Sequence, residues 1–131
     1  MDANRLKALP LFEGVDDDEL HKIAPFVAEV SVSEGNHLVD EGDYSYHFMA
    51  IEEGNAEVLR GGEHLADLGP GDFFGEMGLV ERDRRIATVV AKTPMRLITL
   101  TSWDMKRLEK SIPSAAQKIR ETIETRKPAE G

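Results

Sequence analysis

Between Val30 and Leu100 the sequence breaks into short apolar or alternating runs, and this pattern most limits what the chain can fold into. Clusters of Gly, Asn, Asp and Pro interrupt the runs and favour tight turns. Segments of this length between turn signals are typical of strands in a small antiparallel sandwich or barrel. The runs are HLVD, YHFMAIE, AEVLR, HLADL, ATVVA and MRLITL, and the turns include Glu34-Gly35-Asn36, Glu53-Gly54-Asn55 and Gly69-Pro70-Gly71-Asp72.

Helical patterns flank this region on both sides. On the N-terminal side, apolar residues recur at i, i+3, i+4 and i+7, which indicates a helix. Asp16 and Glu19 form a potential capping box at its beginning, and Pro25 bends or ends it. On the C-terminal side, Thr101 or Ser102 caps a helix, and Pro113 separates it from a second one. The apolar stripes are Leu20, Ile23, Ala24 and Val27; Met105, Leu108 and Ile112; and Ala115, Ile119 and Ile123, while Leu11 and Phe12 pack under the first helix.

Composition limits the classes of molecule that the chain is expected to bind. The 131 residues carry a formal net charge of −9, which argues against nucleic acid because phosphate neutralisation needs a basic face. No apolar run approaches the ~20 residues of a membrane helix, so we expect no membrane contact. The N-terminus lacks the apolar stretch of a secretory signal, and there is no cysteine. We therefore expect a cytoplasmic protein.

Three arginines lie within four residues of this acidic chain, at positions 82, 84 and 85, close to a glutamate in the stretch Gly75-Glu76-Met77-Gly78. Gly75 allows close approach to a ligand, and the amides of a short helical turn over residues 76–80 form an anion site. A guanidinium at Arg85 binds phosphate bidentately, and the Glu76 carboxylate accepts from a sugar hydroxyl. These residues fit phosphate plus ribose, although a solvated ion pair around a tight turn fits the spacing equally well.

The stretch FGEMGLVERDRRIATVVA resembles the phosphate-binding cassette of cyclic nucleotide-binding domains, the family of the catabolite activator protein and the protein kinase A regulatory subunit. The family pattern is F-G-E-[LIM]-[AGS]-L, a short variable stretch, then P-R-x-A-[TS]-V. The match includes Phe74 to Leu79, Arg85 and Ala87 to Val89, and the resemblance extends from Leu9 to Ile112. The usual proline before the arginine is replaced by Arg84, which makes the loop more flexible and more positive.

The resemblance implies a role for each matching residue. Arg85 pairs with the cyclic phosphate, and Glu76 accepts from the ribose 2′-hydroxyl. The backbone amides of Gly75, Ile86 and Ala87 are nearby donors. The remaining implied binding residues, which shape the pocket, are Phe74, Met77, Gly78, Leu79 and Val89. The C-terminal helix closes over the nucleotide, and Ile119 or Ile123 caps the purine.

Other chemistries fit the sequence less well. His37, His47 and His64 are scattered over three strand regions without an H-x-H pair, so we expect no metal, and His21 is expected on a helix surface. No serine lies in a G-x-S-x-G elbow, and Asp72, Glu81 and Asp83 are interpreted as ion-pair partners of the arginines. Trp103 is expected in the core, with stacking on a base as the alternative.

These observations predict one non-catalytic domain over residues 1–131, mainly β with flanking helices. We expect N-terminal helices in 1–29, a jelly-roll-like β-barrel in 30–100 with the cassette at 72–91, and C-terminal helices in 101–126. The expected ligand is cAMP, with cGMP as the second choice, and no other cofactor. Because the sequence stops at Gly131 without a recognition helix, output passes to a protein partner, or the chain is the sensor part of a transcription regulator. A barrel of the same fold that no longer binds nucleotide remains a further alternative.

Overall fold

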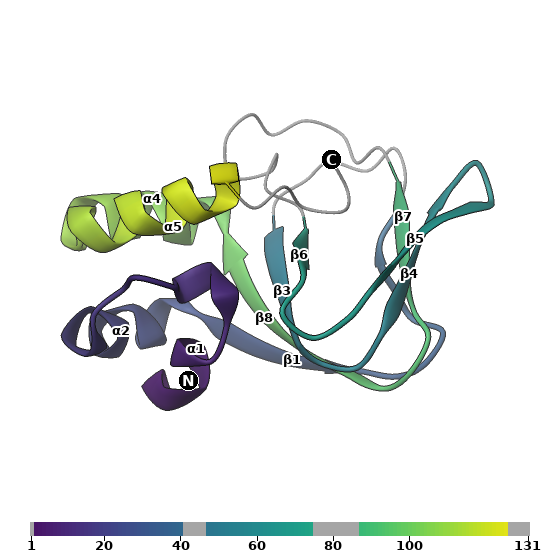
Figure 1. Cartoon of the computed structure of the whole chain (residues 1–131), viewed down its shortest axis with the longest axis horizontal. Helices are drawn as coiled ribbons and strands as arrows, with labels where there is room; N and C mark the ends of the chain where they lie inside the picture. The colour runs from purple at the N-terminus through teal and green to yellow at the C-terminus, as the bar shows by residue number, and fades with distance from the viewer. Residues whose placement is uncertain (1, 41–46, 75–86, 126–131) are drawn as a thin grey trace.

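A computed structural model describes residues 2–40, 47–74 and 87–125 of the chain. Figure 1 shows the helices gathered at one end of the molecule and the two sheets at the other. The eight described strands are β1 (Ala28–Val32), β2 (His37–Val39), β3 (His47–Glu53), β4 (Ala56–Arg60), β5 (Glu63–Leu68), β6 (Phe73–Phe74), β7 (Thr88–Ala91) and β8 (Met95–Thr101).

The strands form two antiparallel sheets that follow the jelly-roll order. One sheet has the order β1-β8-β3-β6 and the other β2-β7-β4-β5. The expectation of a mainly β fold of jelly-roll type with flanking helices is therefore confirmed. Within the described residues the strands make two separate sheets rather than one closed barrel.

Alternation along β3 and β8 divides the buried side chains between two cores, because successive residues of a strand point to opposite faces. One set faces the helices and the other faces the opposite sheet. The helical core holds Phe48, Ala50, Ile98 and Leu100 with Leu6, Leu20, Ile23, Met105, Leu108 and Ile119. The inter-sheet core holds Ile51, Val58, Leu68, Phe74, Val89, Met95 and Leu97.

The N-terminal segment is helical, in four short pieces. They are α1 (Ala3–Lys7), the 3₁₀ turn η1 (Pro10–Phe12), α2 (Asp17–Ile23) and the 3₁₀ turn η2 (Ala24–Phe26). The predicted capping box at α2 is present, with the Asp16 amide donating to Glu19 Oε1 at 3.3 Å. Pro25 lies in the 3₁₀ turn that ends the helix, as the sequence indicates. The predicted helix is thus confirmed, and its apolar stripe is buried.

The C-terminal helices are α4 (Ser102–Ser111) and α5 (Pro113–Thr125). Thr101 is the cap of α4, and its Oγ1 accepts from the Asp104 amide at 3.0 Å. Helix α5 packs on η1 and α4. Its residues Ala115, Ala116 and Ile119 are almost fully buried in the helical core.

A polar cluster fastens α5 to α2. Glu19 accepts a hydrogen bond from the Ser114 hydroxyl at 2.5 Å and another from Lys118 Nζ at 3.0 Å. These two donors, Ser114 first, lower the pKa of Glu19 to about 2. The charged carboxylate therefore joins the first turn of α2 to α5.

A second cluster fastens α1 to the outer face of the sheet that contains β1, β8 and β3. Arg5 donates to Glu29 on β1 and to Glu52 on β3, and Arg96 on β8 lies 3.2 Å from the same Glu29 carboxylate. The hydrogen bonds from Glu52 and Glu29 raise the pKa of Arg5 further above its ordinary value. Charged groups thus fasten α1 to the sheet and α5 to α2.

Gly54 sets the turn between β3 and β4. Its φ is +94°, and a Cβ at this position would lie 2.5 Å from the carbonyl oxygen of Pro94. Only glycine fits there, because side chains avoid both that conformation and that contact. The turn brings the β3–β4 hairpin against the chain between β7 and β8.

Candidate functional site

The described part of the predicted site lies in the inter-sheet core. Phe74, Ala87 and Val89 are all buried there, with at most 1% of each residue exposed. The other predicted site residues lie outside the described residues: Gly75, Glu76, Met77, Gly78, Leu79, Arg85 and Ile86. Their roles stay predictions.

The strands at the two ends of segment 75–86 belong to opposite sheets. Phe74, the last residue of β6, pairs with Met49 on β3. Val89 on β7 pairs with Val39 on β2 and with Val58 on β4. The segment that carries Glu76 and Arg85 therefore connects one sheet to the other.

The turn before β6 is held firmly. The Gly69 amide donates to the Asp72 carboxylate at 2.8 Å, and the Asp72 amide donates back to the Gly69 carbonyl at 3.0 Å. The Gly71 amide donates to the Ile51 carbonyl, and the Ile51 amide donates to the Asp72 carbonyl. Asp72, which the sequence suggested as an ion-pair partner, instead closes this turn and fixes where β6 begins.

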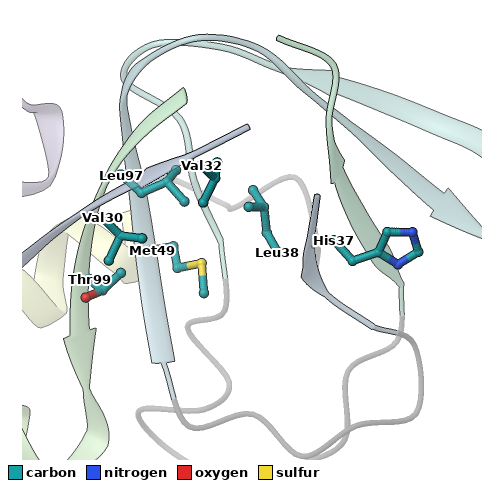
Figure 2. Close-up of a pocket in the computed structure, with 7 residues that line it drawn as sticks. All are labelled: Val30, Val32, His37, Leu38, Met49, Leu97 and Thr99. Atoms are coloured by element: carbon teal, nitrogen blue, oxygen red, sulfur yellow. The ribbon is translucent and has the colours of Figure 1, made fainter. Parts of the chain in front are cut away.

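A cavity of about 280 Å³ opens between the sheets beside these strands. It is lined by residues of β1, β8 and β3 from one sheet and of β2 from the other. Figure 2 shows the lining side chains turned toward a common space, with the His37 ring turned away from it. The lining residues are Val30, Val32, His37, Leu38, Met49, Leu97 and Thr99.

The cavity wall is almost entirely apolar. Thr99 adds one hydroxyl, and His37 Nδ1 lies 2.6 Å from the Asp40 carboxylate. Such a wall suits a flat apolar group, and the described lining residues offer no lysine or arginine to a phosphate. Among the described residues, these lining side chains are therefore suited to an apolar group rather than to an anion.

Sequence reasoning did not find this cavity. Alternation places Val30 and Val32 on one face of β1, and Leu97 and Thr99 on one face of β8. That pattern gives the face of each side chain, but not whether the two sheets fill the space between them. Met49 is the informative residue, because it lines the cavity and also pairs with Phe74 at the end of β6.

The structure contradicts one expectation about the helices and leaves the choice of purine cap untested. Trp103 is 52% exposed on α4, so it is not a core residue. Ile119, a candidate to cap the base, is fully buried in the helical core and does not line the cavity. The other candidate, Ile123, has no described side chain.

The expectation that His21 lies on a helix surface is confirmed. His21 is exposed on α2, and its Nδ1 lies 2.8 Å from the Asp17 carbonyl. His64 on β5 lies beside Glu57 on β4, with 2.7 Å between His64 Nδ1 and Glu57 Oε2. Across residues 2–40, 47–74 and 87–125 no group of three potential ligands is arranged to hold a metal ion.

Comparison with known proteins decides the family. A profile of the family described as "Cyclic nucleotide-binding domain" matches residues 29–111 of the 131. The chain belongs to the cyclic nucleotide-binding domain family. The resemblance read from the cassette motif is thereby confirmed. Family membership supports binding of a cyclic nucleotide, and the expectation of a regulatory rather than a catalytic domain is also confirmed.

The relatives of this cyclic nucleotide-binding domain are larger proteins. A cAMP-dependent protein kinase regulatory subunit of Schizosaccharomyces pombe is 35% identical over 104 residues, which cover 79% of this chain and 25% of that protein. A cyclic nucleotide-gated potassium channel of Rhizobium etli is 35% identical over 115 residues, covering 88% and 32% respectively. The chain thus spans about a quarter to a third of these relatives.

Solved structures share the fold. The catabolite activator protein of Thermus thermophilus superposes with a TM-score of 0.77 at 27% identity, over 88% of this chain and 57% of that one.

No helix among the described residues is both long and apolar enough to span a membrane.

Proposed function

We propose that this domain binds cAMP, with the phosphate and ribose on segment 75–86 and the adenine ring against the apolar cavity. The observation that carries the proposal is the position of the cavity. Its wall includes Met49, which pairs with Phe74 of the cassette, and Leu38, which lies in the strand that pairs with β7. A ligand divided into an anionic half and an apolar half suits this arrangement.

The size of the cavity supports the same division. At about 280 Å³ it lies just below the roughly 300–1,000 Å³ typical of pockets that enclose a whole small ligand. It therefore suits one part of a nucleotide rather than all of it. A base gains from burial against aliphatic side chains, whereas a phosphate there would be an unpaired charge.

Arg85 and Glu76 take the polar half of the ligand in this proposal. Arg85 binds the cyclic phosphate bidentately, aided by backbone amides of the cassette. Glu76 accepts from the ribose 2′-hydroxyl. Both roles rest on the match of the motif to the family pattern and on the chemistry of the two side chains.

We favour cAMP over cGMP because of the residue that follows the arginine. Guanine-selective members of the family often have threonine at this position, and Ile86 offers no hydroxyl to the guanine amino group. The S. pombe regulatory subunit, whose name refers to cAMP, supports the same choice.

The signal would leave through α5 to a protein partner rather than to nucleic acid or a membrane. Helix α5 is joined to α2 through Glu19 and packs on η1, so a shift of α5 must disturb the N-terminal helices. Amide exchange over 114–125 with and without cAMP would test this route. Equal exchange rates with and without cAMP would argue against this route.

A cytoplasmic location stays a prediction.

Titration calorimetry tests the binding proposal directly. We expect saturable binding of cAMP, weaker binding of cGMP and little binding of 5′-AMP, which lacks the cyclic phosphodiester. A protein that is folded but releases no heat with either cyclic nucleotide would refute the proposal.

A further inference from the structure

Helix α4 carries an exposed stripe that the proposed nucleotide site does not use. Trp103, Lys106, Arg107 and Lys110 recur at i, i+3, i+4 and i+7, so they lie on one side of the helix. All four are exposed, and Trp103 keeps 52% of its surface accessible. The opposite side of the helix, with Met105, Leu108 and Ile112, is buried in the helical core. We refer to the four exposed residues as the α4 face.

Local contacts orient one of these cations, Arg107. The Arg107 guanidinium lies over the Phe26 ring, 5.1 Å from its centroid, and 3.6 Å from the Asp104 carboxylate. Lys106 and Lys110 make no ion pair with another residue in the described parts of the chain. The acid next to Lys110 in sequence, Glu109, is engaged by Arg120 of α5, and the acid nearest to Lys106, Asp104, lies beside Arg107.

The stripe contrasts with the rest of the chain. The sequence has 25 acidic and 16 basic residues, so a helix face with three cations, of which only Arg107 lies beside a described carboxylate, is a local exception. Trp103 places a large aromatic side chain beside these cations, and it is one of three large hydrophobic residues that are exposed in the described parts of the chain. Trp and Arg are the residue types that contribute most to protein interfaces.

We propose that the α4 face binds an acidic segment of a partner protein, one that presents carboxylates beside an apolar side chain. The carboxylates would pair with Lys106 and Lys110, and the apolar side chain would cover Trp103. This inference does not depend on nucleotide binding.

Two other classes of macromolecule fit the face less well. Nucleic acid would meet only three cations on a protein of net charge −9, and its affinity depends on many phosphate contacts. An anionic membrane would meet the whole acidic protein, whose net charge of −9 repels it, whereas a short acidic segment would meet the α4 face alone. The apolar side of α4 is already buried, so the helix cannot insert as an interfacial helix does.

Trp103 supplies a direct probe, because it is the only tryptophan in the chain. We would follow its emission while adding a synthetic peptide in which Glu and Asp surround Leu and Phe at helical spacing. The proposal predicts a saturable blue shift that weakens as salt is added. A peptide with Lys in place of each acid, a DNA duplex and phosphatidylserine vesicles should leave the emission nearly unchanged.

A matched pair of variants locates the effect. Lys110→Glu should weaken peptide binding about tenfold, because an attraction becomes a repulsion. Arg60→Glu makes the same charge change at an exposed site on β4, and it should change binding less than about twofold. Equal losses in the two variants would mean that net charge alone drives binding, and the proposal would be wrong.

Three further results would overturn the proposal. One is the absence of a blue shift with the acidic peptide up to its solubility limit. Another is tighter binding of the duplex or the vesicles than of the peptide. The third is a dimer of the protein alone, seen by sedimentation and lost in Lys110→Glu, because that would assign the face to a second copy of the chain.

Discussion

Met49 on β3 lies directly across from Phe74 on β6, and both side chains face the inter-sheet core. Met49 also lines the cavity, and Phe74 immediately precedes the segment with the predicted phosphate-binding residues. The wall of the cavity and the beginning of that segment are therefore neighbours in one sheet. A ligand that contacts both must span this pair.

Filling the cavity should weaken nucleotide binding. Leu38→Trp places a large ring in the space assigned to the base and should reduce the affinity for cAMP by roughly 1–3 kcal/mol, because the base can no longer be buried there. Leu59→Trp on β4 is the matched control, since Leu59 follows the inward-facing Val58 and points to the other face of the sheet. Calorimetry would measure both, with thermal unfolding to confirm that each variant is folded. If Leu38→Trp binds cAMP like the wild type, the base does not occupy the cavity.

The proposed ribose contact can be tested with a modified ligand. Glu76→Gln keeps the shape of the side chain but replaces a charged acceptor with a neutral one, so cAMP should bind about 1–2 kcal/mol more weakly. The difference between the two proteins should nearly vanish for 2′-deoxy-cAMP, which has no hydroxyl to donate. A penalty that persists with the deoxy ligand would show that Glu76 positions the arginine instead.

The choice of base should respond to residue 86. The wild type should prefer cAMP over cGMP by roughly 1–3 kcal/mol, because the extra polar groups of guanine lack partners. Ile86→Thr supplies a hydroxyl and should narrow the gap in competition titrations, whereas Ile86→Val, which adds none, should leave it unchanged. Equal affinities of the wild type for the two nucleotides would contradict this account.

The polar cluster between α2 and α5 should make stability depend on pH. The pKa of Glu19 falls from 4.5 to about 2 on folding, so its carboxylate stabilises the protein above pH 4.5 and this contribution is lost as the pH falls toward 2. Glu19→Gln should lower the free energy of unfolding by roughly 1–2 kcal/mol at neutral pH. Denaturant titrations at several pH values should show that difference shrinking over this acidic window. Glu63→Gln, at an exposed end of β5, is the control, and a pH-independent difference for Glu19→Gln would be evidence against the ionic link.

Much of the fold could be predicted because it depends on local chemistry. The turn clusters separated most of the strands, the alternation of apolar residues fixed their faces, and Asp16 with Glu19 marked the beginning of α2. Helix α1 lies in the range 1–29 that was predicted to hold helices but was not identified as a separate element, and strand β1 was missed. Helix α1 has five residues and little apolar periodicity, and four of the five residues of β1 are exposed, so neither gives a strong local pattern.

The features of the site that the sequence could not predict depend on packing between distant segments. No local rule says that the space bounded by Val30, Leu38 and Met49 stays open, because it depends on the spacing of two sheets. Trp103 begins a helix after a strand, where burial is common, yet α4 turns it toward solvent. Ile119 fits an apolar stripe, but that stripe faces the helical core instead of the cavity.

The most direct test of the central claim compares two neighbouring arginines by calorimetric titration with cAMP. Arg85→Ala should weaken binding by about 2–4 kcal/mol, or roughly 30- to 1000-fold, because it removes a charge-assisted bond and leaves the phosphate unpaired. Arg84→Ala removes the same charge one residue earlier, outside the motif, and should have a much smaller effect. Equal losses of affinity in the two variants would contradict the assignment of Arg85 as the phosphate ligand.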